Sequence, residues 1–146
     1  MATGLMMVGM TASAGHASAC TNIWNWMQPP FDTEHIQPAG QQLEGTTGPA
    51  QCGTSLLISG ARSSHCAYPF EYRADVAQQV FDDLAQLMTH CVGPEVPEQT
   101  GKNGVNHPDS YDQKTFQADN GSISLSLKDK GNLNQTYIFL RFDAMP

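Results

Sequence analysis

The chain has few charged residues and very little positive charge. Only 14% of its 146 residues are charged, and seven basic residues stand against fourteen acidic ones, which gives a formal net charge of −7. The first basic residue is Arg62, and only Lys128 and Lys130 lie close together. Binding to nucleic-acid phosphates or to an anionic membrane surface requires clustered Lys and Arg. The composition therefore argues against both partners, and we exclude nucleic acid.

The common sequence signatures of catalysis and cofactor binding are also missing. The chain contains no G-x-S-x-G, no H-E-x-x-H, no phosphate loop and no dinucleotide-binding fingerprint. It has no run of the ~20 apolar residues that a membrane-spanning helix needs. We therefore expect no cofactor, no metal and no transmembrane segment, and we favour a protein that is not an enzyme.

The first 19 residues carry no Asp, Glu, Lys or Arg and resemble a secretory leader. An apolar run over residues 4–10 precedes small, weakly polar residues that end in Ala17-Ser18-Ala19, as in the apolar and cleavage regions of a signal peptide. A basic first region is missing, so we expect the true start to lie upstream of Met1. We predict that residues 1–19 are a signal peptide truncated at its N-terminus, and that the protein is exported to the periplasm or the extracellular space.

Lipid attachment at Cys20 is the alternative to ordinary cleavage. Lipoprotein signals place a larger aliphatic residue three positions before the cysteine, where this chain has Ala17. We therefore favour cleavage directly before Cys20, or after Ala14, which releases the protein without a lipid anchor.

The cysteines are even in number and contain no C-x-x-C pair; they are Cys20, Cys52, Cys66 and Cys91. In an exported chain this pattern predicts two disulfides. The repeated His65-Cys66 and His90-Cys91 dipeptides leave a metal site open, but zinc ligands usually lie two to four residues apart and chain neighbours rarely face one ion. A helix over 74–90 would span ~25 Å, which makes a bond between Cys66 and Cys91 taut. We favour Cys52–Cys66 across a hairpin and Cys20–Cys91 at the helix end.

The clearest expected element is an amphipathic helix over residues 74–90. Its apolar stripe recurs at three- and four-residue steps and contains Val76, Val80, Leu84 and Leu87 or Met88, widened by Ala77, Phe81 and Ala85. Asp75 followed by Gln78 predicts a capping box, and Gly93-Pro94 predicts the end of the helix.

Strands are expected on both sides of this helix. Residues 54–59 and 65–72 predict a hairpin with its turn at 60–63, and Pro69 indicates an edge or a bulge. Three further segments predict a meander, namely 114–118, 122–127 and 136–142. In 122–127, Ile123, Leu125 and Leu127 alternate with three serines, which should face solvent.

These elements predict an α+β domain over residues 54–146, in which one helix packs on an antiparallel sheet of about five strands. The sheet comprises the N-terminal hairpin and the C-terminal three-stranded meander, braced by disulfides. Residues 20–53 are expected to be irregular, apart from a short strand at the start of 22–31 that prolines stop.

Our leading functional hypothesis is a non-enzymatic envelope or secreted module that binds another protein through its long loops or an exposed sheet edge. Loops this long are uncommon in compact domains without a use. The alternative is a small hydrolase or metal-dependent enzyme, because one loop gathers His107, Asp109, Tyr111 and Asp112, and another contains Asp32, Glu34 and His35. We favour a simpler explanation of the first loop, a Pro-Asp turn with Asp capping and the tyrosine anchoring the loop end. A weaker alternative is glycan binding through Trp24 and Trp26, which would share a face in an extended segment.

Overall fold

The structure is a computed structural model that describes residues 14–28, 43–97, 101–103 and 111–145. In chain order its helices and strands are α1 (Ala14–Trp26), β1 (Gln51–Leu56), β2 (Arg62–Glu71), α2 (Asp75–Cys91), β3 (Gly101–Asn103), β4 (Tyr111–Ala118), β5 (Gly121–Lys130) and β6 (Gln135–Ala144). A short 3-10 helix, Gly131–Leu133, joins β5 to β6. The side chains of 14–19, 101–103 and Tyr111 are not described.

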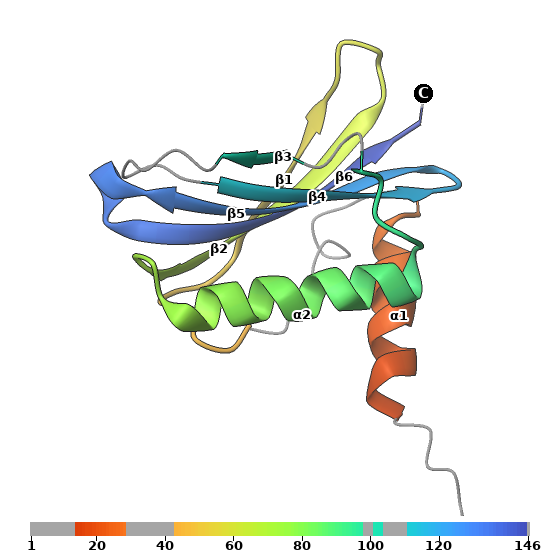
Figure 1. Cartoon of the computed structure of the whole chain (residues 1–146). Coiled ribbons are helices and arrows are strands. Elements are labelled where there is room, and N and C mark those ends of the chain that lie inside the picture. Colours follow the sequence, from red (N-terminus) through yellow and green to blue (C-terminus); the bar gives the residue numbers. More distant parts are fainter. Residues whose placement is uncertain (1–13, 29–42, 98–100, 104–110, 146) are drawn as a thin grey trace, which may run out of the picture.

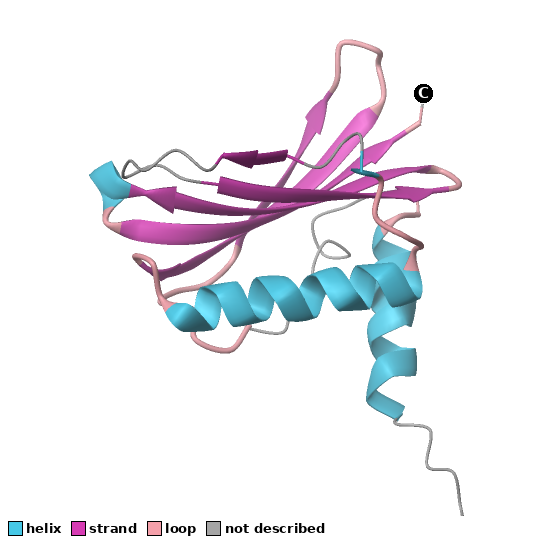
Figure 2. Ribbon diagram, in the orientation of Figure 1, coloured by secondary structure: helices cyan, strands magenta, loops and turns pink. Residues whose placement is uncertain are grey.

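The strands form one antiparallel sheet in the order β1-β2-β6-β5-β4-β3. The hairpin β1–β2 and the meander β4–β5–β6 join through the pairing of β2 with β6. Helix α2 runs along one face of this sheet, and α1 crosses the C-terminal end of α2 (Figures 1 and 2). The predicted α+β fold with a hairpin, a helix and a meander is confirmed. The sixth strand, β3, is a three-residue edge whose Gly-Lys-Asn sequence has no apolar pattern.

The core lies between α2 and the sheet face that this helix covers. From α2 it contains Ala77, Phe81, Ala85 and Met88, and from the sheet it contains mainly Tyr68, Phe70, Phe116, Ile123, Leu125, Ile138, Leu140 and Phe142. Val76, Val80, Leu84 and Leu87 pack at its margin. The apolar stripe is therefore centred one position later than we expected.

The alternation in β5 is confirmed. Ile123 and Leu125 are fully buried on the core face. The three serines lie on the opposite face, paired with β4 and β6. The expectation that all three face solvent is wrong for Ser126, which is buried at 7% exposure, while Ser122 and Ser124 are partly exposed. The turn between β4 and β5 falls on Asp119-Asn120, and the Asn-Gly dipeptide that ends it is typical of tight hairpin turns.

The start of α2 differs from the expected capping box. Ala74 is the N-cap and makes no side-chain cap, so Asp75 lies within the first turn. There its carboxylate is favoured by the helix dipole rather than by a cap hydrogen bond. The helix ends as predicted, with Gly93 at a φ of 153° and its N–H donated to the carbonyl of Met88.

The β1–β2 hairpin lies earlier in the chain than we expected. Strand β1 occupies 51–56 rather than 54–59, and β2 occupies 62–71 rather than 65–72. The turn is made by 57–60, with Gly60 at a φ of 84° and its N–H donated to the carbonyl of Leu57. Ser59-Gly60 is a strong turn dipeptide, and the apolar run before it ends at the tip instead of inside a strand. Pro69 lies beyond the last residue paired with β1, at a local edge as predicted.

The expected strand at 22–31 is wrong, because α1 is helical to Trp26. Cys20, Ile23, Trp26 and Met27 are buried, and their three- and four-residue spacing is that of a helix face. Asn120 on the β4–β5 turn donates from Nδ2 to the carbonyl of Met27 at 2.6 Å, which fixes the end of α1. Residues 43–50 are turns and irregular chain, 29–42 lie outside the described residues, and the domain boundaries stay predictions.

Candidate functional site

The outer edge of β1 is a strand edge that no described strand covers. β1 stands at the end of the strand order and pairs only with β2. Opposite each other, Cys52 and Cys66 have Cα atoms only 4.1 Å apart, the close spacing of a pair that exchanges no backbone hydrogen bonds. Residues Cys52, Thr54 and Leu56 therefore direct their N–H and C=O groups away from β2, toward the edge.

This edge lacks the devices that usually protect a sheet from pairing with other chains. Natural edges carry charged residues, prolines or bulges, or are very short. The six residues of β1 contain no charge and no proline, and their register with β2 is continuous. The opposite edge, β3, has three residues and includes Lys102. The two edges therefore differ, and among the described strands β1 offers the longer unprotected edge.

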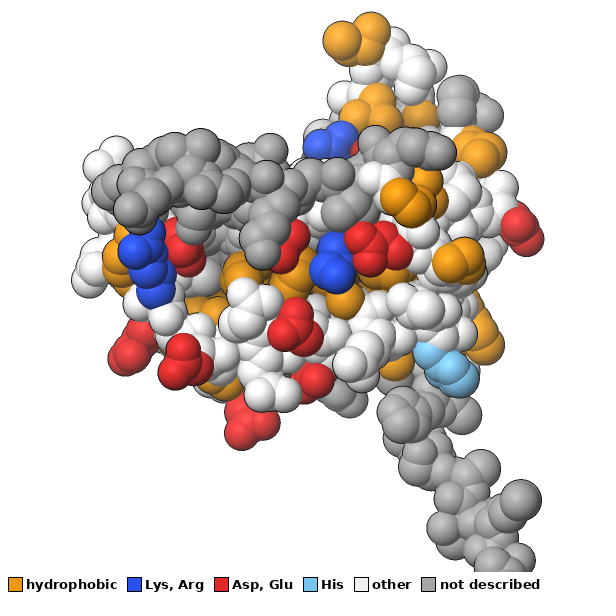
Figure 3. Space-filling view, viewed as in Figure 1, with side chains coloured by type: hydrophobic (Ala, Val, Ile, Leu, Met, Phe, Trp, Pro, Cys, Tyr) orange, Lys and Arg blue, Asp and Glu red, His pale blue; other side chains and the backbone are white. Residues whose placement is uncertain are grey.

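The tip of the β1–β2 hairpin adds an apolar surface next to this edge. Leu56 is 73% exposed and Ile58 is fully exposed, and Leu57 between them is partly exposed. The hairpin projects from the body of the sheet, and hydrophobic side chains are visible at its far end (Figures 1 and 3). From Gln51 to Gly60 the chain has no charged residue. Neighbouring exposed apolar side chains are a feature of protein interaction sites.

The predicted disulfides are both present, Cys20–Cys91 and Cys52–Cys66. The first ties α1 to the end of α2, where Trp24 also donates from Nε1 to the carbonyl of Cys91 at 2.7 Å. The second ties β1 to β2 and so fixes the strand whose outer edge is open. Because the Cys20 sulfur is bonded to Cys91, it is not available for the thioether of a lipid anchor.

Most of the predicted polar loop lies outside the described residues. His107 and Asp109 lie outside the described residues. Asp32, Glu34 and His35 of the other loop lie outside them as well. Tyr111 is the first residue of β4, and Asp112 follows it as a half-buried residue opposite Leu127. The enzyme hypothesis centred on this loop therefore stays a prediction.

Trp24 and Trp26 do not form a shared platform. Trp24 is 48% exposed, but Trp26 is 1% exposed and its ring centroid lies 5.9 Å from that of Phe142. Two residues apart on a helix, the side chains point in different directions. The pair of exposed indoles that glycan stacking requires is therefore absent.

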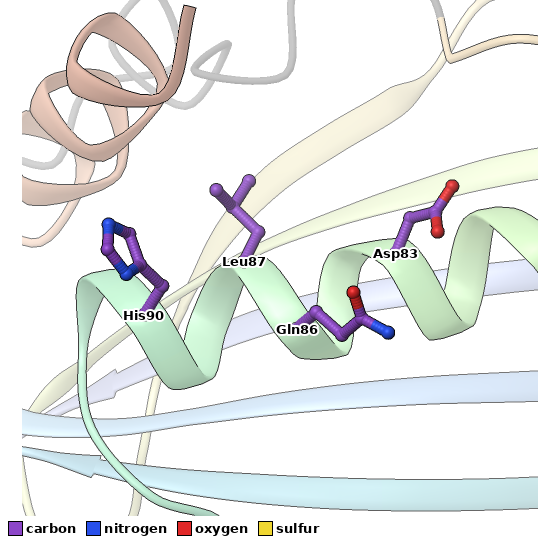
Figure 4. Close-up of a pocket in the computed structure, with 4 residues that line it drawn as sticks. All are labelled: Asp83, Gln86, Leu87 and His90. Carbon is purple, nitrogen blue, oxygen red and sulfur yellow. The ribbon is translucent and has the colours of Figure 1, made fainter. Parts of the chain in front are cut away.

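A shallow cavity of ≈ 360 Å³ lies beside α2. Asp83, Gln86, Leu87 and His90 project toward it from successive turns of the helix (Figure 4). His90 lies in the last turn of α2, where a cation interacts favourably with the helix dipole. The cavity is lined by one carboxylate, one amide, one imidazole and one apolar side chain.

Two classes of site have no counterpart in the part of the chain that the structure describes. Within it, no three His, Cys, Asp or Glu side chains gather where they could hold a metal ion. None of its helices has the length and apolar content needed to cross a membrane.

The sequence predicted an exposed sheet edge as a binding surface but did not identify its residues. Leu56 and Ile58 were assigned to a strand interior, although the Ser59-Gly60 dipeptide that follows them could have placed them at a tip. No family model, curated protein or solved structure matches this chain.

Proposed function

We propose that this protein is an exported, non-enzymatic module that binds another protein by pairing its β1 edge with an extended segment of the partner. The observation that carries the proposal is the unprotected edge of β1 next to an exposed apolar tip. Addition of a partner strand to a free sheet edge is a common mode of peptide recognition, in which main-chain hydrogen bonds supply affinity.

The geometry defines what the partner segment must offer. Its backbone would exchange hydrogen bonds with the outward groups of Cys52, Thr54 and Leu56, which recur at every second residue. Its side chains would alternate, and apolar ones near the turn would cover Leu56 and Ile58. Because residues 51–60 carry no charge, recognition would depend on backbone pairing and apolar contact rather than on ion pairs. The partner is therefore a protein with an extended, apolar-patterned segment.

Delivery to an oxidising compartment supports this proposal. Two disulfides favour an exported protein, since cytosolic thiols are kept reduced. The leader-like residues 1–19 support the same route, and the periplasm or the extracellular space is part of the proposal. There the hairpin would meet envelope or secreted proteins.

A selection from a library of displayed random peptides tests the proposed partner chemistry. Peptides selected on the wild-type protein are then measured against Thr54→Pro and its matched control Thr54→Val. Proline removes an N–H that points away from β2, so it leaves the β1–β2 pairing intact. We expect Thr54→Pro to weaken binding about tenfold or more, because it also blocks close approach of the partner strand. Valine keeps the N–H and should bind like the wild type.

Equal affinity of Thr54→Pro and wild type for every selected peptide would contradict the proposal. Ile58→Asp gives a second, independent measurement, because covering a carboxylate at the tip with an apolar side chain of the partner costs desolvation free energy and should weaken binding. Sedimentation of the free protein identifies the competing occupant of the edge. A concentration-dependent dimer that Thr54→Pro abolishes would mean that β1 pairs with a second copy of this chain.

A further inference from the structure

The sheet face opposite α2 is covered by no helix among the described elements (Figure 1). A groove of ≈ 490 Å³ is hollowed into it, within the range of small-molecule sites. Four small side chains line the hollow, namely Ser55, Ser63, Ser124 and Ser126. We call this hollow the serine groove. A row of serines alone is not a site, so the argument depends on the groups around them.

The serine groove carries positive charge on an otherwise acidic protein. Arg141 and Lys128 line it, against one carboxylate, Asp143. Nε of Arg141 donates to Oδ1 of Asp143 at 2.6 Å, which holds the planar guanidinium in place while its remaining N–H groups can serve a ligand. Lys128 has no acidic partner among the described residues, and its ammonium lies 5.4 Å from the centre of the Phe139 ring. The groove is therefore short of negative charge.

A buried hydroxyl faces this groove without a partner. Ser63 lines the groove and is 0% exposed, and its Oγ has no hydrogen-bond partner among the described residues. It lies directly across from Asp143 in the sheet register, and Asp143 accepts the hydrogen bond from Arg141. Leaving a buried polar group unpaired costs ~1–3 kcal/mol. An oxygen atom of a ligand on the floor of the groove is the acceptor that this hydroxyl lacks.

His65 borders the same floor, and Gly53 sets its position. The two residues are cross-strand neighbours, and a Cβ at position 53 would lie only 3.2 Å from Nε2 of His65. Glycine therefore gives the imidazole room against the β1 backbone. His65 is also the register partner of Arg141, which in turn pairs with Ser124. One row across three strands thus presents an imidazole, a guanidinium and a hydroxyl to one ligand group.

We infer that the serine groove binds a small organic anion. Its carboxylate or phosphate group would lie among Arg141, His65 and Ser63, since guanidinium recognises planar and tetrahedral oxyanions by paired hydrogen bonds. A ring or other apolar body would extend over Phe139 beside Lys128. The site is on the sheet face and not on the β1 edge, so this inference does not depend on the proposed partner strand.

Titrations followed by amide NMR on the oxidised full chain test this inference, with benzoate, phenyl phosphate and inorganic phosphate as probes. We expect benzoate or phenyl phosphate to shift the amides around His65, Ser124 and Arg141 saturably, and inorganic phosphate to bind more weakly because it lacks a ring. The comparison of benzoate with phenyl phosphate distinguishes a carboxylate ligand from a phosphate ligand. If no probe binds saturably, or the shifts map to another surface, the inference is wrong.

Two variants and one control assign the binding to this groove. Arg141→Gln should weaken binding about tenfold or more by removing a charge-assisted donor, and Ser124→Asp should do the same by repelling the anion. Arg73→Gln is the matched control, because Arg73 pairs with Asp129 away from the groove. Thr54→Pro should leave anion binding unchanged, which separates this site from the proposed partner edge. Equal affinity of Arg141→Gln and wild type, with both folded by thermal melt, would overturn the assignment.

Discussion

At the scale of single residues, Tyr68 differs from the other large side chains of the core. Its ring is buried, but its hydroxyl has no hydrogen-bond partner among the described residues. Burial raises the pKa of this hydroxyl well above the ordinary tyrosine value of about 10. The neutral form is therefore retained in the folded protein, while the unfolded chain ionises first as the pH rises.

We expect Tyr68→Phe to leave the free energy of unfolding unchanged or to raise it by ~1 kcal/mol, because the substitution removes an unsatisfied polar atom and keeps the ring. The raised pKa adds a pH dependence. Ionisation of Tyr68 leaves the free energy of unfolding unchanged below pH ~10. At higher pH the free energy of unfolding falls, because the tyrosine ionises in the unfolded chain before it ionises in the folded protein. Urea unfolding at neutral and alkaline pH should show a shallower alkaline loss for Tyr68→Phe. A large loss of stability at neutral pH would show that the hydroxyl has a partner.

The two faces of β5 give a second prediction. Leu125 is fully buried against the helix side, while Ser124 faces the serine groove opposite Arg141. Leu125→Asp should cost ~4 kcal/mol or more, since it buries an unpaired charge. Ser124→Asp should change the free energy of unfolding by no more than ~0.5 kcal/mol, because its carboxylate lies beside a guanidinium on an open face. Thermal melts decide, and equal effects would mean that the register of β5 is wrong.

At the scale of elements, prediction from sequence succeeded where the pattern was long and periodic. Helix α2 is 17 residues long with a regular apolar stripe, and β5 contains the alternating residues 122–127, so their type and orientation were predictable. Helix α1 was missed because its polar residues and following prolines resemble the end of a strand, and its buried face depends on contact with α2. The β1 edge depends on strand order, which long-range pairing sets and local sequence does not encode.

The disulfide Cys20–Cys91 gives a prediction at this scale, because it joins the two helices through cysteines that are 71 residues apart in sequence. Replacing both cysteines by serine should lower stability by ~2–5 kcal/mol through the added freedom of the unfolded chain. Amide hydrogen exchange should quicken most in α1, whereas the pairing of β2, β5 and β6 should stay protected. Faster exchange confined to the β1–β2 hairpin would contradict the role of this disulfide.

At the scale of the whole molecule, three parts of one sheet have different roles. Its inner face forms the core with α2, its outer face forms the serine groove, and its β1 edge is open to a partner strand. The two proposed sites share β1 and β2, which Cys52–Cys66 joins across the register. The Cys52–Cys66 disulfide therefore holds together the two strands that both sites use. It requires an oxidising compartment in which disulfides form and persist.

The most direct test of the account is the state of the thiols in natively purified, non-reduced protein. Alkylation under denaturing conditions followed by mass spectrometry of proteolytic fragments should find no free thiol, and should find Cys20 linked to Cys91 and Cys52 linked to Cys66. Four alkylated cysteines in a protein that was folded before denaturation would contradict the disulfide bracing and export on which the proposed binding edge depends.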